Sequence, residues 1–506
     1  MHGRDKEELR LTRRQWLGGC AVGIGFTAFE SLLELNVFAG RAGINPEAAA
    51  GLSHVQRLAA FVDRARYEDI SAAARRELKV RVIDSLGCAI GALAGEPMTM
   101  LRAHLEDFGG KPRATLVGGG KTAPDRAAFY NGALVRYLDF NDSFLAKGET
   151  CHPSDNLGAV LAASEYAGRS GKELLTALAV AYEVHCRLSE AAPVRAKGFD
   201  HVTQGAYAAA AGVAKALGLD PAKAAHAIAI SGTANNALRV TRTGALSHWK
   251  GLAYPNTGFA ATHAAFLAMR GITGPLEVFE GEKGFMETIA GRFAIDWERE
   301  GLEAILRTII KKYNAEIHSQ TAIEAILELR EAHRLRAEDV EQIEVRVFDV
   351  AQQIIGGPEK YNVRTKEEAD HSLPYLVAVG LLDGEVTPAQ YLPERILRQD
   401  VQELLRRVVV RADEEFSRGF PDEMPTRLEV KLRDGRSLTV EKRDYEGFFT
   451  RPMSWEKVVA KFETLADGFA PAALRKSIAD AVANLDSISL RELTKLLGRV
   501  KSKERP

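Results

Sequence analysis

The feature that most constrains the fold is a series of segments with helical periodicity, between about Leu52 and Ile310, that are apolar almost all round. One reads AYAAAAGVAKALG and another SGKELLTALAVAYEVHCRL, with suitable helix starts at Ser170-Gly171 and Asp220-Pro221. Alanine and glycine side chains let neighbouring helices approach closely. The sequence therefore predicts a large body of buried, tightly packed helices.

The pattern changes after about Ile310, where a further helix, TAIEAILELREAHRL, is followed by alternation from Val340 to Val350 and a long polar loop around residues 356–368. The stretch RLEVKLRDGRSLTVEKR places Asp434-Gly435 between two alternating runs, which is a strong hairpin signal. Helical periodicity returns with WEKVVAKFETLA. We expect a leader or extension at 1–47, a helical domain that begins at 48–312, a smaller α/β domain at 313–449, and C-terminal helices at 450–506 that return to the helical domain.

Charge and cysteine usage exclude several classes of protein. Lysine plus arginine number 67 and aspartate plus glutamate 68, so the chain has no global basic field for nucleic acid or an anionic membrane, and its partner is expected to be small. The four cysteines are far apart without a Cys-x-x-Cys pair, which argues against a zinc ribbon, a disulfide framework and an iron–sulfur cluster. The twelve histidines are scattered and no His-Glu-x-x-His occurs, so we expect neither a metal nor another cofactor.

The N-terminus resembles a twin-arginine export leader. TRRQW at 12–16 precedes an apolar stretch from Leu17 to Phe29, with a possible cleavage point near Ala39. Glu30 and Glu34 interrupt the apolar region, so two alternatives stay open: export to the periplasm, or a leader-derived extension of a cytoplasmic protein. The apolar run is too short to span a bilayer, and we expect no stable membrane insertion.

One loop concentrates groups suited to acid–base chemistry. The segment YLDFNDSFLAKGETCHPSDN brings carboxylates, a hydroxyl, a thiol and an imidazole within seventeen positions, namely Asp139, Asp142, Ser143, Cys151, His152 and Asp155. The alternative is structural: Asp142 and Asp155 cap helices, and His152 is a hydrogen-bonded loop residue. A thiol nucleophile is disfavoured, since the side chains of the adjacent Cys151 and His152 are expected to diverge.

Three further segments carry histidines or clustered cations. KGFDHVTQG holds His201, LRVTRTGALSHWKG holds Arg239, Arg242, His248 and Lys250, and IIKKYNAEIHSQ holds Lys311, Lys312, Glu316 and His318 at the domain boundary. Arginine and lysine bind carboxylates directly, so these cations suit a polycarboxylate substrate. A solvated basic loop and a surface helix start are the alternatives.

Taken together, these segments resemble the MmgE/PrpD family, which includes 2-methylcitrate dehydratase, cis-aconitate decarboxylase and iminodisuccinate epimerase. The resemblance rests on AAFYNGALVRYLDFNDS, CHPSDNLGAVLAASEYAG, FDHVTQGAYAAAAGVAKALGL, ISGTANNALR, KKYNAEIHSQTAIEA and EADHSLPYLVAVGLLDG, in family order. It implies a mainly α fold, with a large discontinuous helical domain and a smaller α/β lid domain, a homodimer, and an active site in the cleft between the domains.

The resemblance also implies site residues. The family's motif residues fall on Asp139, Ser143, His152, His201 and Lys311, with Lys312 as a close rival, and the A-E-x-H-x-Q-T-A segment adds His318. The chain departs from the pattern at Ser247, where relatives place a lysine, and Lys250 is the candidate to supply that charge from a shifted position.

The reaction these assignments favour is elimination of water from a 2-hydroxy tricarboxylate such as 2-methylcitrate, giving 2-methyl-cis-aconitate in propionate catabolism without a metal. His152 would be the base, oriented by Asp139, and His201 or His318 would protonate the departing hydroxyl. Arg242, Lys250 and Lys311 would bind substrate carboxylates. Two alternatives remain: decarboxylation or epimerisation on the same fold, and an exported carboxylate-binding protein without catalysis.

Overall fold

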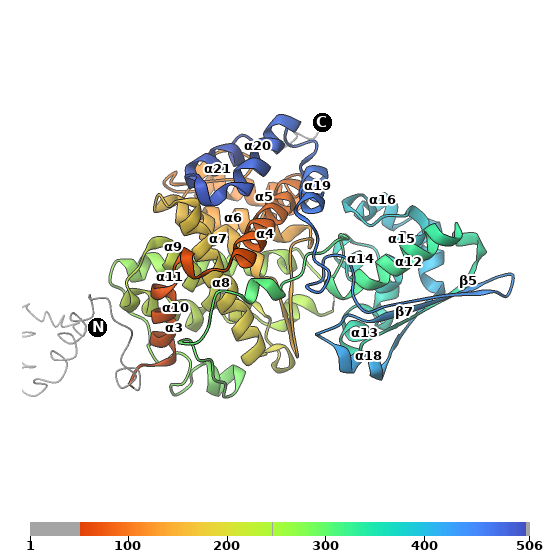
Figure 1. Cartoon of the computed structure of the whole chain (residues 1–506), viewed down its shortest axis with the longest axis horizontal. Helices are drawn as coiled ribbons and strands as arrows, with labels where there is room; N and C mark the ends of the chain where they lie inside the picture. Colours follow the sequence, from red (N-terminus) through yellow and green to blue (C-terminus); the bar gives the residue numbers. More distant parts are fainter. Residues whose placement is uncertain (1–50, 245, 502–506) are drawn as a thin grey trace, which may run out of the picture. The chain divides into compact units, whose positions relative to one another are not determined.

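The structure is a computed structural model in which residues 51–244 and 246–501 are described (Figure 1). The predicted leader at 1–47 lies outside the described residues. Among the residues described, none of the helices is both long enough and apolar enough to cross a membrane. The predicted fold class is confirmed, since the chain is mainly α-helical with a small sheet.

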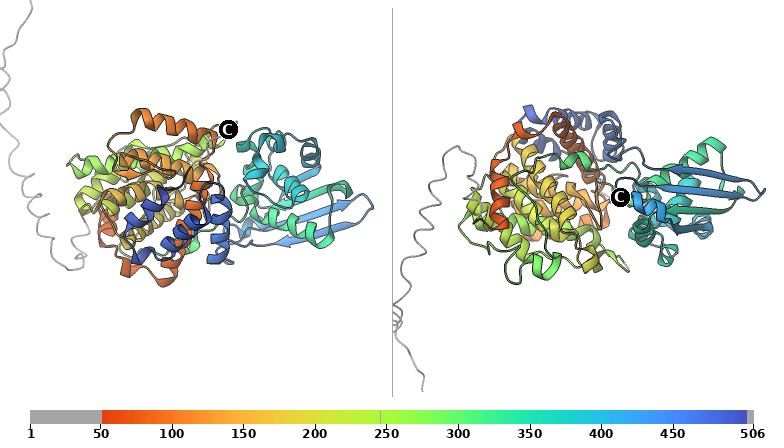
Figure 2. Two further views of the ribbon diagram at one scale, coloured as in Figure 1. Left: turned by 90° about the horizontal axis from the view of Figure 1, so that it is seen from above. Right: turned by 60° about the horizontal axis from the view of Figure 1, so that its bottom comes forward.

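Two large hydrophobic cores organise the chain between residues 53 and 501. The first joins apolar residues from 55–310 to residues from 458–500, and we call the elements around it the helical body. The second joins residues from 309–448, together with Leu145, and we call the elements around it the α/β lobe. In Figure 2 the blue C-terminal helices accordingly lie on the helical body.

The helical body contains nine helices before the α/β lobe and three after it, within the described residues. They are α3 (His54–Arg64), α4 (Ala72–Gly91), α5 (Glu96–Phe108), α6 (Pro124–Tyr137), α7 (Leu157–Tyr166), α8 (Gly171–Ala191), α9 (Val202–Leu217), α10 (Pro221–Ala234) and α11 (Trp249–Met269), then α19 (Trp455–Ala466), α20 (Ala472–Ala483) and α21 (Leu490–Leu497). Two short hairpins accompany them: β1 (Ala114–Thr115) with β2 (Lys121–Thr122), and β3 (Phe144–Ala146) with β4 (Glu149–Cys151).

Small residues bring these helices together as the sequence predicts. Gly158 on α7 faces Gly132 on α6 so closely that an added Cβ would lie 2.5 Å from the Gly132 nitrogen. Both predicted helix starts are confirmed: Ser170 accepts a hydrogen bond from the Glu173 amide and Asp220 accepts one from the Lys223 amide. The close α6–α7 approach matters for function, because the loop between these helices carries the predicted catalytic groups.

The α/β lobe is built on one four-stranded sheet in the order β6-β5-β7-β8. Its elements are α12 (Gln320–His333), β5 (Val340–Val347), α13 (Asp349–Ile355), α14 (Lys366–Ala369), α15 (Leu373–Asp383), α16 (Pro393–Ile396), α17 (Gln399–Leu404), β6 (Val408–Ala412), α18 (Glu414–Gly419), β7 (Thr426–Leu432) and β8 (Ser437–Lys442). Strand β5 pairs parallel with β6 and antiparallel with β7.

The predicted hairpin is confirmed, because β7 and β8 pair antiparallel around Asp434-Gly435 and Gly435 has a φ of +89°. The expected long polar loop at 356–368 is only partly irregular. It contains a short 3-10 helix, Pro358–Tyr361, and the start of α14. Thr365 caps α14 by accepting a hydrogen bond from the Glu368 amide. The sequence therefore contains a helix start at Thr365, although the polar residues of the segment predict a loop.

Helix α19 joins the C-terminal segment to the first core through Phe462, which is fully buried against α4 beside Gly87. We expect Phe462→Ala to lower the free energy of unfolding by about 3–5 kcal/mol, because it removes a buried ring and leaves a cavity. Chemical denaturation measures this change. Lys476→Ala, at a side chain 74% exposed on α20, is the control and should stay within about 0.5 kcal/mol of wild type. Equal stability of both variants would show that α19 contributes little to the core.

Candidate active site

The loop between α6 and α7 is folded back on itself by the β3–β4 hairpin. Strand β3 begins after Ser143 and β4 ends just before His152, and Phe144 pairs with Cys151. The hairpin thus places the Ser143 hydroxyl oxygen 3.0 Å from Nδ1 of His152, although nine positions separate the two residues. Both residues are buried.

The protonation state of His152 follows from its neighbours. Nδ1 lies 2.8 Å from the backbone carbonyl oxygen of Asp142, which can only accept a hydrogen bond, so Nδ1 carries the proton and Nε2 is the unprotonated nitrogen. Burial lowers the pKa of His152 well below 6.5, and the charges of Arg136 and Lys311 lower it further. The imidazole is therefore neutral at pH 7, as a general base requires.

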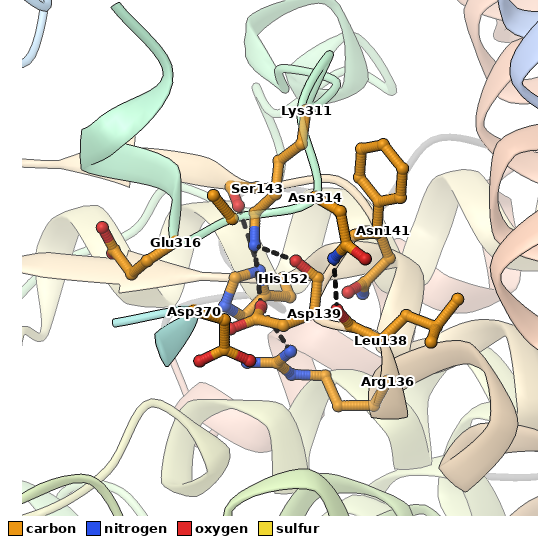
Figure 3. Close-up of polar contacts among 12 residues, drawn as sticks. Arg136, Leu138, Asp139, Asn141, Ser143, His152, Lys311, Asn314, Glu316 and Asp370 are labelled. Atoms are coloured by element: carbon orange, nitrogen blue, oxygen red, sulfur yellow. Dashed lines mark hydrogen bonds and ion pairs between the residues drawn. The ribbon is translucent and has the colours of Figure 1, made fainter. Parts of the chain in front are cut away.

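Asp139 is the centre of a cluster of buried charges (Figure 3). Its carboxylate contacts the Arg136 guanidinium at 2.6 Å, the Lys311 ammonium at 2.7 Å and the Lys250 ammonium at 3.3 Å. Burial raises the pKa of Asp139, but these three charges outweigh burial and hold it well below 3.8. Asp139 also has a φ of +54°, which is uncommon outside glycine. The hydrogen bonds of the His152 ring are to Asp142 and Ser143 and its ring neighbour is His201, so no described contact places Asp139 directly on His152.

Lys311 enters the cluster from the segment that leads into the α/β lobe. Backbone hydrogen bonds join Ser143 to Ile309 in both directions, at 2.9 and 2.8 Å, and fix this segment beside the β3–β4 hairpin. The Asn314 side chain donates to the Leu138 carbonyl oxygen at 2.6 Å, which is a second contact between this segment and the residues beside Asp139. The fully buried Lys311 ammonium then donates to both the carbonyl oxygen and the carboxylate of Asp139, each at 2.7 Å.

Lys312, the rival candidate, points elsewhere. Its ammonium lies 3.4 Å from Glu324 and 3.0 Å from Glu446, and its side chain is 32% exposed. The structure thus brings Lys311 into the cluster and leaves Lys312 outside it.

Lys250 comes from the first turn of α11 and is 3% exposed. Its ammonium lies 2.9 Å from Asp370 and 2.9 Å from Nδ1 of His371, both in the α/β lobe, in addition to its contact with Asp139. Lys250 therefore supplies a buried charge where Ser247 carries none. The geometry also groups Asp139, Asp370 and His371 closely enough to offer ligands to a metal ion, but the Lys250 ammonium lies among them.

The second predicted histidine, His201, lies beside His152, with ring centroids 5.4 Å apart. Asp200 contacts Nδ1 of His201 at 2.8 Å and Nε of Arg242 at 2.7 Å. Arg242 belongs to a short 3-10 helix, Arg239–Arg242. The structure thus brings His201 and Arg242 together through an aspartate that the sequence analysis did not select.

His318 is less directly placed. Its Nδ1 contacts Glu316 at 2.6 Å, and its ring packs against Phe348 and Phe420 in the α/β lobe. The backbone amide of Glu316 donates to the carbonyl oxygen of Asp370 at 2.9 Å. Glu316, two positions before His318, is thus bonded to a residue of the charge cluster, whereas the described side-chain contacts of His318 itself are all within the lobe.

Sequence reasoning missed five ionisable groups in and beside the cluster: Arg136, Asp200, Lys366, Asp370 and His371. A signal existed for Arg136, which precedes Asp139 by three positions on an otherwise apolar helix end. Asp370 and His371 stand in the stretch EADHSLPYLVAVGLLDG, whose acidic and imidazole groups directly precede an apolar helix.

Asp155, noted in the loop as a possible acid or cap, is buried behind Arg136. One of its oxygens accepts from the Asn141 amide at 2.9 Å, and the other lies 3.6 Å from Nε of Arg136. Burial raises the pKa of Asp155 to about 7, despite the opposing charges of Arg136 and Arg242. Close to neutral pH this carboxyl is therefore partly protonated, which leaves the surrounding cations with a larger surplus of positive charge.

The assembled groups can perform two chemical tasks. A neutral imidazole with an unprotonated Nε2 can accept a proton. The buried cations Arg136, Lys250 and Lys311, together with the partly buried Arg242, can bind carboxylates and offset negative charge that develops beside the imidazole. The combination suits removal of a proton next to a carboxylate.

Comparison with known proteins agrees with this chemistry. The MmgE/PrpD N-terminal domain matches residues 56–298, and the MmgE/PrpD C-terminal domain matches residues 313–487. The 2-methylcitrate dehydratase of Salmonella typhimurium is 29% identical over 407 residues, covering 76% of this chain and 81% of that protein. The 2-methylcitrate dehydratase of Cupriavidus necator is 30% identical over 401 residues, covering 74% and 81%. An alkylcitrate dehydratase of a fungal species is 27% identical over 447 residues, covering 82% and 86%.

The two domain matches lie in family order and together span most of the chain. The three relatives are 27–30% identical to the chain, match 74–82% of it and are dehydratases by name. The chain therefore belongs to the MmgE/PrpD family, and it is an enzyme of the lyase class.

Proposed function

We propose that the chain eliminates water from a 2-hydroxy tricarboxylate such as 2-methylcitrate. The observation that carries the proposal is the position of a neutral His152 beside the buried cations Lys311 and Arg136. The names of the relatives support a citrate-like substrate. In this proposal 2-methyl-cis-aconitate is the product and propionate catabolism the metabolic setting, and the active enzyme is a homodimer.

The difficult step is removal of a proton α to a carboxylate, because the resulting enediolate-like species gathers negative charge. Lys311, Lys250 and Arg242 offset that charge in a buried site, where electrostatic interactions are stronger than in water. Asp139 holds the two lysines at fixed positions, so little reorganisation is needed as the charge develops. His152 accepts the proton on Nε2, while the Asp142 carbonyl oxygen keeps the opposite nitrogen protonated.

Departure of the hydroxyl needs a proton donor, and His201 and His318 are the two candidates. His201 is the nearer to His152. His318 belongs to the α/β lobe and is paired with Glu316. Ser143, whose hydroxyl lies next to His152, is assigned to substrate binding.

The proposed reaction needs no metal ion. Among the described residues, Asp139, Asp370 and His371 are the groups that best resemble a metal site. The Lys250 ammonium lies within contact distance of all three, which supports the proposal. A lysine in that place supplies the positive charge that a metal ion would supply to a substrate carboxylate.

The experiment that tests the function follows ultraviolet absorbance of the conjugated alkene with purified full-length protein. We expect 2-methylcitrate to give a rise in absorbance that persists in the presence of a chelator, and citrate serves as the comparison substrate. No rise with either hydroxy acid, together with carbon dioxide release from cis-aconitate, would replace dehydration by decarboxylation. Binding of 2-methylcitrate without turnover of any substrate would indicate a binding protein.

Replacing the proposed base tests the mechanism. We expect His152→Ala to lower kcat by about 10²- to 10⁴-fold, the usual contribution of a positioned base. His226→Ala is the matched control, since His226 on α10 is half-buried and its ring bonds to Gly274 alone among the described residues. Steady-state kinetics with 2-methylcitrate measures both variants, and thermal melting verifies that they are folded. Wild-type turnover in His152→Ala would remove His152 from the mechanism.

The two neighbouring lysines give a second test. Lys311→Met should lower kcat/KM by about 10- to 100-fold, because it removes a buried charged hydrogen-bond donor beside the reacting carbon. Lys312→Met should stay within about twofold of wild type, because its partly exposed ion pairs lie outside the cluster. The reverse order of effects would assign substrate binding to Lys312.

A further inference from the structure

Beside His152 lies a chain of three side chains: Arg242, which is partly buried, and Asp200 and His201, which are buried. Asp200 is fully buried and His201 is 2% exposed. One carboxylate oxygen of Asp200 lies 2.8 Å from Nδ1 of His201, and the other lies 2.7 Å from Nε of Arg242. Arg242 also donates to the backbone carbonyl oxygen of Lys250 at 3.3 Å, which links this chain to the charge cluster.

This arrangement fixes the position of the proton on His201. Burial raises the pKa of Asp200, but the Arg242 guanidinium and the His201 ring outweigh burial and lower it below 3.8, so the carboxylate is ionised. An ionised carboxylate can only accept hydrogen bonds, and Nδ1 of His201 must therefore donate. Burial lowers the pKa of His201 to about 3, so the ring carries this one proton and Nε2 is unprotonated.

The free nitrogen of His201 is buried in a distinctive setting. Nε2 has no hydrogen-bond partner among the described residues. The groups that face the ring are His152 in an edge-to-face arrangement, His185 stacked at 6.3 Å and Tyr254 stacked at 6.3 Å, together with Asp200 and Arg242. An unpartnered acceptor is costly to bury, so its retention beside the proposed base suggests a use in the reaction.

We propose that Asp200 is a positioning residue, which holds His201 with a protonated Nδ1 and an unprotonated Nε2 beside His152, and that Arg242 fixes Asp200 in that orientation. The inference rests on the proposed dehydratase reaction. It makes His201 an acceptor in the resting enzyme. The proton that His152 removes from the substrate carbon passes to Nε2 of the adjacent His201, which then donates it to the departing hydroxyl, so no proton is gained or lost overall. Asp200 stabilises the imidazolium that forms between these two transfers.

Asp200→Asn is a sharp test, because the local donors dictate how the introduced amide must turn. Two donors compete for the new amide oxygen: the Arg242 guanidinium, now 2.7 Å from one Asp200 oxygen, and the Val202 backbone amide, now 3.2 Å from the oxygen that faces His201. The charged and shorter contact is the stronger, so the amide oxygen faces Arg242 and the amide nitrogen faces His201. The amide nitrogen is a donor, and Nδ1 of His201 must then accept. The substitution is therefore expected to move the ring proton from Nδ1 to Nε2 without changing the size of the side chain.

Two measurements report the outcome. Two-bond proton–nitrogen correlation spectra of the full chain labelled with ¹⁵N-histidine distinguish the two tautomers, and the His201 signal is assigned by its loss in His201→Gln. Kinetics with 2-methylcitrate should show kcat lowered by about 10²- to 10⁴-fold in Asp200→Asn, the cost of a wrong tautomer or a lost base, with KM changed by less than about threefold. The acid limb of the kcat profile should also change, since the charge that stabilises the imidazolium is gone.

Glu183→Gln is the matched control. Glu183 is a buried carboxylate that contacts Arg187 at 2.9 Å and accepts from the Ala304 amide, but the recorded contacts of its carboxylate include no histidine. We expect Glu183→Gln to lower the free energy of unfolding by about as much as Asp200→Asn does, while its kcat and histidine spectra remain as in wild type.

The inference is overturned if wild-type His201 carries its proton on Nε2, or if Asp200→Asn changes neither the tautomer nor kcat. A moved proton with unchanged kcat would make Asp200 structural only. If wild type turns over no hydroxy acid, the dehydratase proposal fails, and the spectra still decide whether Asp200 sets the tautomer.

Discussion

The ion pair between Lys311 and Asp139 is the interaction on which the rest of the site depends. Lys311 lies on the segment that leads into the α/β lobe, and Asp139 ends the turn after α6 in the helical body, so the pair ties together segments 172 positions apart. Both charges are buried, and leaving one of them without the other costs several kcal/mol, about 3–5 in comparable cases. Two backbone features accompany this contact: the positive φ of Asp139, and the pairing of Ser143 with Ile309, which lies two residues before Lys311.

The same cations set the ionisation of the groups around them in opposite directions. Positive charge from Arg136 and Lys311 holds the Asp139 carboxylate ionised, and it also opposes protonation of His152. A site arranged in this way keeps its anions charged and its base neutral over the same pH range. Asp155 is the exception, because burial outweighs the cations there and raises its pKa to about 7.

The sequence predicts the helical body and the β7–β8 hairpin because local patterns determine them: small apolar residues at helical spacing, capping residues, and Asp434-Gly435 between alternating runs. It also locates the loop that carries Ser143 and His152, although their contact depends on a hairpin too short to recognise. It could not choose between Lys311 and Lys312, since that choice depends on the tertiary pairing of Ile309 with Ser143, far away in the chain. Asp370 and His371 lie more than 200 positions from Asp139, and only tertiary packing brings them together.

Three carboxylate–imidazole pairs surround the cluster, and they differ in whether the proton is fixed. His201 has one partner at Nδ1, Asp200, which accepts, and His318 has one at its own Nδ1, Glu316. His371 differs, because Nδ1 lies 2.6 Å from Asp370, which accepts, and 2.9 Å from the Lys250 ammonium, which donates. One nitrogen cannot donate and accept with a single proton arrangement, so the proton on His371 is linked to the position of Lys250. Lys250 is also assigned to bind a substrate carboxylate. If the ammonium moves toward that carboxylate, its contact with Nδ1 of His371 weakens, and Nδ1 can then donate to Asp370. Substrate binding and the proton position on His371 are therefore coupled through Lys250.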